Sequence, residues 1–372
     1  MSNHASEIKT VAVIGAGPGG FRLVANLGLM AYRLRLNDID EAKLTAIRVR
    51  GGIDVEGAPG GFAPLELATT DLRATVDGAD LIIVVSGGNT QAAVARALAP
   101  LLVDGQTILL MQGNTGGSLV VRRELDRAAC RAKIELAETD TYPYAMRFVA
   151  PTKMRQTTQK RWMQIAAFPG NRSTAVHARL VPLFPQAVAA PDILHTGLMN
   201  VNAILHVANC LANAGRIERG GGYMFYGEGV TPAVARMYEA IDAERMAIAR
   251  ALNVNVPSLV DWIERAYNVR EPDLVKTFQR LTAEPDGPYL ANRAAGTLNH
   301  KYVTEDVPTG LIPISELGLA TGTPTPAINT LIDMARLMTG KTFADEARTL
   351  EKMGMLGLAP AKIRDVMRDG FC

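Results

Sequence analysis

The chain has 372 residues, of which 48% are hydrophobic and 20% charged, and its formal net charge is +2. This is ordinary globular composition rather than that of a disordered chain, and the length suggests two domains. The small net charge gives no long-range field for nucleic acid. Only three cysteines occur, Cys130, Cys210 and Cys372. They lack metal-ligand spacing, so the sequence predicts neither a metal site nor a disulfide framework.

The first nine residues contain no apolar run, and every apolar stretch is far shorter than the roughly 20 residues that cross a bilayer. The sequence therefore predicts neither a secretory signal nor contact with a membrane. We expect a cytoplasmic location.

The first half of the chain, from Thr10 to about Ala190, alternates short β-branched runs with amphipathic stretches. This rhythm is typical of a parallel sheet with helices on both faces. Residues 11–14, 81–85 and 107–111 are hydrophobic almost throughout, which predicts buried strands. Helices are expected among them, at 91–101 and 118–132.

The strand-like runs stop after Pro191. Periodicity then predicts helices in four segments, 196–214, 231–252, 258–267 and 325–339. The Pro- and Gly-rich segment 284–313 breaks this pattern and is predicted to be a loop, and long loops are more often functional than idle. We therefore expect an α/β protein of two domains. Residues 1–190 would form a doubly wound parallel sheet, and residues 191–372 would form an all-helical domain.

A glycine motif joins the first predicted strand to a predicted helix at 21–30. The motif is Gly15-Ala16-Gly17-Pro18-Gly19-Gly20. Gly15 permits a tight turn, Gly17 lets the backbone approach a pyrophosphate, and Gly20 lets helix and strand pack closely. The free N–H groups at the helix N-terminus favour phosphate. Such a motif alone is weak evidence, but the strand before it and the helix after it predict a Rossmann cofactor site that includes Pro18 and Gly19.

The second predicted strand, 32–37, is followed by Asp38, 23 residues after Gly15. An acid at this place accepts a hydrogen bond from a ribose 2′-hydroxyl and repels a 2′-phosphate, which favours NAD as the cofactor. The alternative is that Asp38 caps the helix expected near Glu41, a role for which Asp40 is equally suited. Asn37 could tolerate either cofactor and leaves NADP open.

Two further glycine-containing loops follow predicted strands. They are Ser86-Gly87-Gly88-Asn89 and Gln112-Gly113-Asn114-Thr115-Gly116-Gly117. In open α/β sheets, ligands bind at the carboxyl ends of the strands. We expect Ser86 and Gly87 to approach the cofactor and Asn114 to approach the substrate. The alternative is that both loops are plain strand-to-helix turns.

The predicted helix at 196–214 is apolar except along one stripe. This amide stripe consists of Asn202, His206, Asn209 and Asn213, which share one helical face. Another face, expected to be core, carries Leu198, Val201, Leu205 and Ala208. Burying three amides and an imidazole is costly unless each finds a partner or lines a cavity. We therefore expect the amide stripe to face an active-site cleft and Asn202 to bind substrate.

Of the five histidines, only His206 has this setting. The unperturbed pKa of a histidine, about 6.5, lets it take and give a proton near neutrality. A structural role in the helix is the alternative. A catalytic histidine would need a carboxylate to hold its tautomer. Spacing does not choose among the acids of the second domain, although Asp306, in the long predicted loop, is a natural candidate.

Several short blocks of sequence stand out in the second domain. They are Ile193–Thr196, Asn200–Ala203, Tyr226–Pro232, Asp242–Arg245, Glu305–Pro313, Ser315–Gly318 and Thr349–Lys352. In this order they resemble the opine dehydrogenase family, of the octopine/nopaline type, and the resemblance runs over almost the whole chain. It implies that His206 exchanges a proton and that Asp306 orients it. It also implies NAD(P)H-dependent condensation of an amino acid with a 2-oxo acid, through an imine, to a secondary amine dicarboxylate.

The resemblance draws attention to three further positions. Arg147 matches a family arginine near the cleft, where a guanidinium suits a carboxylate substrate; a surface or structural ion pair is the alternative. Lys301 stands where the family carries an arginine and offers a point charge without the planar fork, so a different or more weakly bound amino acid is expected. Gln112 stands where the family carries a proline, which would change how the 2-oxo acid sits.

Two other functions stay open from the residues alone. One is a dehydrogenase of 2-oxo or 2-hydroxy acids that uses no amine, and the other is a nucleotide-binding protein without turnover. The amide stripe argues against the second. The partners we expect are an amino acid and a 2-oxo acid, with no nucleic acid and no membrane. We also expect a homodimer formed through second-domain helices.

Overall fold

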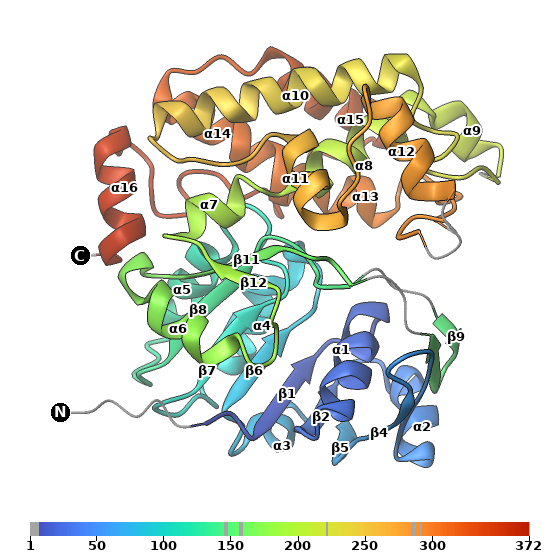
Figure 1. Ribbon diagram of the computed structural model, residues 1–372. Helices are drawn as coiled ribbons and strands as arrows, with labels where there is room; N and C mark the ends of the chain where they lie inside the picture. The colour runs from blue at the N-terminus through green and yellow to red at the C-terminus, as the bar shows by residue number, and fades with distance from the viewer. Residues whose placement is uncertain are drawn as a thin grey trace.

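The computed structural model describes residues 7–144, 148–155, 159–220, 222–283, 287–290 and 292–371. An α/β part that contains the N-terminal strands lies below a helical part formed by later residues (Figure 1). The last strand, β12, ends at Ala189, and the first helix of the helical part, α7, begins at Ile193.

The main sheet has eight strands in the order β12-β11-β8-β7-β6-β1-β2-β5. They are β1 (Thr10–Ile14), β2 (Arg33–Asn37), β5 (Leu67–Thr69), β6 (Leu81–Val84), β7 (Thr107–Leu110), β8 (Glu135–Thr139), β11 (Met163–Ala167) and β12 (Ala187–Ala189). Neighbouring strands are parallel except for β8 and β11, which are antiparallel. The predicted doubly wound sheet is thus confirmed, with one antiparallel pair in addition.

Helices cover both faces of this sheet. On one face lie α1 (Pro18–Leu29) and α6 (Ser173–Leu180), and on the other lie α3 (Leu72–Val76), α4 (Gln91–Leu98) and α5 (Gly117–Arg127). Side chains alternate between the faces along a strand, so Val11 and Val13 join the core of the first face, and Ala12 and Ile14 join that of the second. Because both faces are buried at β1, β6 and β7, these central strands are hydrophobic almost throughout.

A second, four-stranded sheet was not predicted. Its order is β4-β3-β10-β9, with β3 (Gly52–Glu56), β4 (Gly61–Pro64), β9 (Phe148–Ala150) and β10 (Lys153–Arg155). It follows α2 (Glu41–Arg50) in the chain and packs on α1, where a Cβ on Gly28 would lie 2.7 Å from the Cβ of Ala63. These strands are only three to five residues long, so they carry little of the alternation that marks a strand in sequence.

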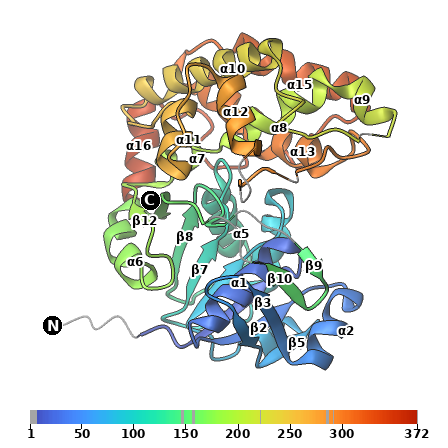
Figure 2. The same ribbon diagram turned by 45° about the vertical axis from the view of Figure 1, so that its right-hand side comes forward.

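Helices make up the regular structure after Ala189 in the described residues, and Figure 2 shows them above the sheet. They are α7 (Ile193–Gly197), α8 (Val201–Ala212), α9 (Ala214–Glu218), α10 (Pro232–Ala251), α11 (Leu259–Tyr267), α12 (Leu274–Ala283), α13 (Lys301–Thr304), α14 (Ile312–Thr321), α15 (Pro326–Thr339) and α16 (Pro360–Asp369). A π-helical turn, η3 (Val307–Leu311), precedes α14, and 3-10 turns occupy Gly88–Thr90 (η1) and Gly170–Arg172 (η2).

The single helix predicted over 196–214 is instead divided into α7, α8 and the start of α9. Between α7 and α8, the carbonyl oxygen of Leu198 accepts a hydrogen bond of 2.8 Å from the buried guanidinium of Arg245. That guanidinium is paired with Asp242, which lies one turn earlier on α10. A distant side chain therefore satisfies a carbonyl group that a continuous helix would have used.

The loop predicted over 284–313 is wrong for its last part, because α13, η3 and the start of α14 occupy it. Pro308 and Pro313 each lie at one of the first two positions of a helical segment, where the missing N–H would have had no partner. A Cβ on Gly310 would lie 2.5 Å from the Cβ of Ala203. This glycine thus allows a close approach to α8 rather than marking a loop.

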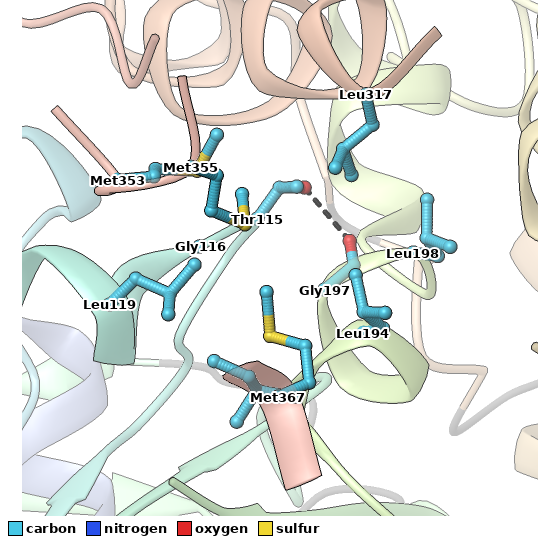
Figure 3. A pocket seen from close by; sticks show the side chains of 11 residues that line it. Thr115, Gly116, Leu119, Leu194, Gly197, Leu198, Leu317, Met353, Met355 and Met367 are labelled. Carbon is cyan, nitrogen blue, oxygen red and sulfur yellow. Dashed lines mark hydrogen bonds between the residues drawn. The ribbon is translucent and has the colours of Figure 1, made fainter. Parts of the chain in front are cut away.

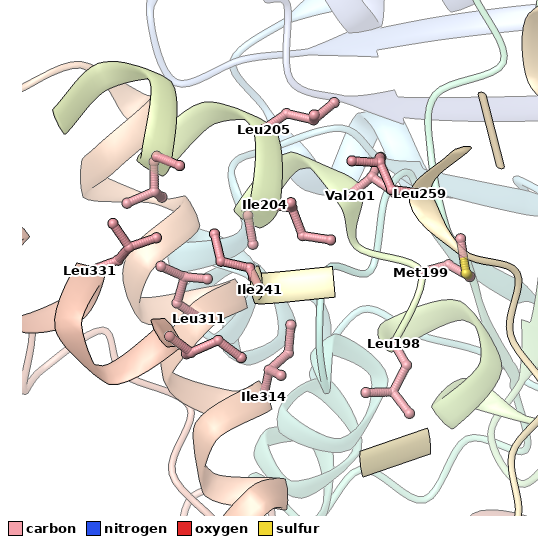
Figure 4. Close-up of a cluster of buried hydrophobic side chains, with 14 of the residues drawn as sticks. Leu198, Met199, Val201, Ile204, Leu205, Ile241, Leu259, Leu311, Ile314 and Leu331 are labelled. Atoms are coloured by element: carbon pink, nitrogen blue, oxygen red, sulfur yellow. The ribbon is translucent and has the colours of Figure 1, made fainter. Parts of the chain in front are cut away.

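The core of the helical part surrounds α8 (Figure 4). Leu198, Val201 and Leu205 are buried there as predicted, together with Ala208. Figure 4 shows side chains from α10, η3, α14 and α15 around them, including Ile241, Leu311, Ile314 and Leu331. The apolar face of α8 is therefore covered by helices that come later in the chain.

The end of the chain returns to the α/β part. Met353, Met355 and Met367 line a small apolar cavity together with Leu119 of α5 and Leu194 of α7 (Figure 3). Its volume of about 10 Å³ has room for no more than one water molecule. At this edge, apolar side chains of the two parts therefore pack against each other with almost no empty space between them. No helix among the described residues is long and apolar enough to cross a membrane.

Candidate active site

The glycine motif forms the turn between β1 and α1. Gly15 has a φ of +112°, and a Cβ on it would lie 3.2 Å from the backbone of Val85. A Cβ on Gly20 would lie 1.8 Å from the carbonyl oxygen of Gly15, so the close packing expected of Gly20 is confirmed. A Cβ on Gly17 would meet nothing within 4 Å. The N-terminus of α1 has no side-chain cap, which leaves N–H groups without a side-chain partner beside this open space.

The carboxylate of Asp38 lies against this turn. It accepts hydrogen bonds from the N–H of Ala16 at 2.7 Å and the N–H of Asp40 at 3.0 Å, and Lys43 Nζ lies 3.1 and 3.3 Å from its two oxygens. Burial acts to raise the pKa of Asp38, but the two N–H donors and the Lys43 ammonium outweigh it and lower the pKa below its usual value. Asp40 caps α2 by accepting from the N–H of Ala42, so capping by Asp38 is excluded.

Ile39, between the two aspartates, is 96% exposed. A large apolar side chain with almost no protein contact lies here beside a carboxylate that is tied to the glycine turn.

The loop after β6 meets the helical part of the molecule. Ser86 Oγ is buried and has no hydrogen-bond partner among the described residues. A Cβ on Gly87 would lie 2.9 Å from a carboxylate oxygen of Glu305, and the N–H of Gly88 donates to Glu305 at 2.9 Å. A Cβ at position 87 would therefore require the Glu305 carboxylate to shift.

The loop after β7 meets the same segment. Asn114 has a φ of +57°, and its side-chain amide donates to Thr309 Oγ1 at 3.0 Å and to Glu305 at 3.3 Å. A Cβ on Gly88 would lie 2.2 Å from this amide nitrogen. These contacts give Asn114 a role in joining the two parts of the molecule, and its expected contact with substrate stays a prediction.

A buried arginine from the C-terminal segment holds both loops. Arg348 is 3% exposed. Its guanidinium donates at 2.7–2.9 Å to the carbonyl oxygens of Gly88, Gly113 and Thr115 and to Oε1 of Gln91. Burial lowers the pKa of Arg348 to about 10, so the side chain is still charged at neutral pH. The planar fork thus fixes two loops relative to each other.

The expected contact between His206 and Asp306 is present. His206 Nδ1 lies 2.7 Å from Asp306 Oδ2, and the histidine is only 8% exposed. Because a carboxylate can only accept, Nδ1 carries the proton in this bond. Nε2 is then the atom left to exchange a proton, and it has no hydrogen-bond partner among the described residues.

Aromatic rings fix the plane of the His206 imidazole. The ring of Tyr302 stacks on it at a centroid distance of 3.9 Å and an interplanar angle of 22°, and Phe225 presents an edge at 6.0 Å. Burial raises the pKa of Tyr302, so its phenol stays protonated at neutral pH. The pair with Asp306 and the stack with Tyr302 together restrict both rotation and translation of the histidine.

The amide stripe is divided in the structure. Half-buried Asn202 lies toward the α/β part, with its amide nitrogen 3.4 Å from Gln112 Oε1. Asn209 instead donates to the carbonyl oxygen of Phe225 at 2.8 Å, and Asn213 donates to Asn209 and to the carbonyl oxygen of Gly229. The expectation that all four residues face a cleft is therefore wrong for Asn209 and Asn213, which hold the segment that carries Phe225.

Two of the predicted substrate residues have few contacts to describe. Lys301 is exposed at the start of α13, directly before Tyr302. Arg147 lies outside the described residues. The roles expected of both stay predictions.

Four residues of this region were missed by the sequence analysis. They are Lys43, Tyr302, Glu305 and Arg348. Glu305 is adjacent to Asp306, and Tyr302 to Lys301, so proximity in sequence could have drawn attention to them. Nothing in the spacing separates Arg348 from the other basic residues of the chain.

The fold and site define a two-domain oxidoreductase with a Rossmann domain and a histidine–carboxylate pair at the domain junction. The family model described as "NAD/NADP octopine/nopaline dehydrogenase, alpha-helical domain" matches residues 189–339. The chain is 36% identical over 363 residues to the opine dehydrogenase of Arthrobacter sp. (strain 1C), covering 97% of this chain and 99% of the relative. It therefore belongs to the opine dehydrogenase family, whose members are NAD(P)-dependent oxidoreductases that act on a secondary amine bond.

Solved structures share the fold at low sequence identity. Octopine dehydrogenase with NADH and L-arginine has a TM-score of 0.72 and 19% identity, with coverage of 95% of this chain and 97% of the other. Yersinopine dehydrogenase with NADP+ has a TM-score of 0.70 and 16% identity, with coverage of 98% of both chains.

We predict that Arg348→Ala lowers the apparent free energy of unfolding by more than about 3 kcal/mol, because four hydrogen bonds from a charged donor are lost in a buried place. Arg348→Lys should recover only part of this stability, since an ammonium lacks the fork. Urea denaturation measures both. Arg336→Ala, which removes an exposed arginine paired with Asp333, is the control and should change stability by less than about 0.5 kcal/mol. If Arg348→Ala lost less than about 1 kcal/mol of unfolding free energy, Arg348 would not be what holds the two loops together.

The division of the amide stripe makes a second prediction. Asn209→Leu should destabilise the protein by roughly 2–4 kcal/mol, because the carbonyl oxygen of Phe225 loses its donor in a fully buried place. Asn202→Leu, the same change on the same helix, should cost less than about 1 kcal/mol and instead reduce activity. Thermal denaturation compares the two variants, and equal losses of stability would show that the stripe is not divided.

Proposed function

We propose that this chain catalyses the NAD(P)H-dependent reductive condensation of an amino acid with a 2-oxo acid such as pyruvate, and the reverse oxidation. The observation that carries the proposal is the oriented His206–Asp306 pair at the junction with the Rossmann domain, in a chain of this family. In the condensation, the amine nitrogen forms a C=N bond to the oxo carbon with loss of water, and reduction of this imine gives a secondary amine dicarboxylate.

The residues of the glycine turn fit NAD(P). Open space at Gly17 and the uncapped N-terminus of α1 suit a pyrophosphate, and the buried hydroxyl of Ser86 still lacks a partner. Exposed Ile39 offers an apolar surface beside Asp38. When bound there, the reduced cofactor supplies a hydride. We assign Gly15, Gly17, Pro18, Gly19, Gly20, Asp38, Ser86 and Gly87 to this site.

His206 handles the proton. With Nδ1–H bound to Asp306, Nε2 can donate a proton to the reacting centre during reduction and accept one during oxidation. Asp306 holds the tautomer that leaves Nε2 free for this exchange. Tyr302 keeps the ring from turning away between the two steps.

The substrate would lie between the loop after β7 and the helices α8 and α13. Asn202 already spans the two parts through Gln112, and Lys301 on α13 offers a cation to a substrate carboxylate. We also assign Asn114 and Arg147 to substrate binding. Lys301 lacks the planar guanidinium of an arginine, so we expect it to bind the carboxylate of the amino acid through one contact rather than two.

Asp38 supports NAD as the preferred cofactor, because its carboxylate lies beside the glycine turn and can accept from a ribose 2′-hydroxyl. Asp38→Ala should weaken NADH binding by about tenfold and raise the ratio of NADPH to NADH affinity. Fluorescence titration with each nucleotide measures this. An unchanged ratio would leave Asp38 with only the structural role of holding Ala16.

We further propose a homodimer formed through the helical domain, and a cytoplasmic location. Apolar side chains on exposed helices support the dimer: Leu337 of α15 is 84% exposed. Sedimentation at several protein concentrations tests the dimer.

The reaction is tested by incubating the protein with NADH or NADPH, pyruvate and a panel of amino acids. We expect oxidation of the nucleotide that depends on both the amine and the oxo acid, and a secondary amine dicarboxylate detected by mass spectrometry. Undiminished turnover without any amine would instead support a plain 2-oxo acid reductase. No turnover over a broad panel of amines and oxo acids would count against both reactions.

The proton-transfer role makes a further prediction. His206→Ala should lower kcat by roughly 10²–10⁴-fold, the usual contribution of a general acid–base group, while NADH still binds. Asp306→Asn should lower kcat by less, because an imidazole remains. His177→Ala is the control, since His177 lies on α6 and makes a hydrogen bond to the carbonyl oxygen of Ala187 on β12, away from the domain junction. Loss of folding or of NADH binding in His206→Ala would show that His206 is structural.

A further inference from the structure

The ammonium of Lys43 lies at the end of the cofactor site where Asp38 is found. Lys43 belongs to the first turn of α2, and its Nζ lies 3.1 Å from one oxygen of Asp38 and 3.3 Å from the other. The lysine side chain is 45% exposed, whereas that of Asp38 is 9% exposed. The lysine is therefore the mobile partner of this pair and the aspartate the fixed one.

The ammonium of Lys43 changes the effect that the Asp38 carboxylate has on the choice between NAD and NADP. A carboxylate alone accepts from a ribose 2′-hydroxyl and repels a 2′-phosphate. With Lys43 on both of its oxygens, the net charge at this place is close to zero, so the repulsion is largely cancelled. An ammonium on a flexible stem can also turn from Asp38 to a phosphate, because it binds as a point charge and needs no fixed plane.

The neighbouring polar side chains already have other hydrogen-bond or ion-pair partners. Arg48, further along α2, is paired with Glu41 and donates to the carbonyl oxygen of Ala68 at 2.8 Å. The side-chain amide of Asn37 donates to the carbonyl oxygen of Thr69 at 2.9 Å. Arg35 is paired with Glu66. Of these basic groups, Lys43 is the one that borders Asp38.

We propose that Lys43 determines cofactor specificity by binding the 2′-phosphate of NADPH, so that this chain uses NADPH as well as NADH. Asp38 accepts from the ribose 2′-hydroxyl of NADH, and Lys43 takes over when a phosphate is present. The inference rests on the proposed function, because it concerns the same nucleotide site. It predicts that the chain binds both NADH and NADPH, whereas Asp38 alone would predict a preference for NADH.

The test measures binding apart from catalysis. Dissociation constants for NADH and NADPH are determined by fluorescence titration for the wild type, Lys43→Ala, Lys43→Arg and Arg50→Ala. Lys43→Ala should weaken NADPH by about tenfold and NADH by less than about threefold, because only the phosphate loses a charge-assisted bond. Lys43→Arg should restore NADPH binding. Arg50→Ala removes the same charge from α2 at a residue paired with Asp54, and should leave the ratio of the two affinities unchanged.

Salt gives a second readout. Raising the ionic strength from about 0.05 M to about 0.5 M should weaken NADPH more than NADH in the wild type, because the 2′-phosphate contact is exposed to screening. In Lys43→Ala this difference should largely disappear. Circular dichroism and the thermal midpoint show that each variant is folded.

The possible outcomes separate the two proposals. If the wild type binds NADH but Lys43→Ala leaves the NADPH-to-NADH ratio unchanged, Lys43 does not determine specificity, and the proposed function stands. The same holds if the wild type binds NADH and fails to bind NADPH. If the wild type binds neither nucleotide, the proposed function fails and this inference fails with it.

Discussion

Two adjacent carboxylates, Glu305 and Asp306, connect the assembly of the two domains to the chemistry of the site. Glu305 accepts from the backbone of Gly88 and from Asn114, both on loops at the carboxyl end of the main sheet. Asp306 accepts from His206 on α8. Because the two residues share a peptide bond, the position of the sheet edge and the orientation of the histidine are set together. A shift of the domains by about one ångström would therefore be transmitted directly to the His206 imidazole.

The junction that keeps this arrangement in place contains a buried charge. Arg348 is surrounded by carbonyl oxygens and a side-chain amide rather than by a directly paired carboxylate. Its burial is tolerated because the guanidinium donates hydrogen bonds to these oxygens, and not because of an ion pair. The apolar contact formed by Met353, Met355 and Met367 also comes from the C-terminal segment and closes one edge of the junction. The last residues of the chain thus complete a site whose chemical groups all lie earlier.

The proposed nucleotide site uses charge in a different way. Asp38 is fixed by N–H groups of the glycine turn and of the residue that caps α2, and exposed Lys43 balances it. In our proposal, the fixed carboxylate accepts from a ribose hydroxyl and the exposed ammonium binds a phosphate, so the glycine turn keeps one conformation for both nucleotides.

The sequence by itself determined the glycine turn, the buried strands of the main sheet and the core face of α8, because each depends on residues close together in the chain. The pairing of His206 with Asp306 came from family resemblance, since spacing could not choose among the acids of the second domain. Only the tertiary structure divided the amide stripe, because periodicity shows which residues share a face and not which segment covers it. The same holds for the helical turns that contain Pro308 and Pro313, and for Arg348, whose partners lie more than 200 residues earlier. Contacts between residues so far apart leave no local pattern in the sequence, and they fix how the two domains meet around this site.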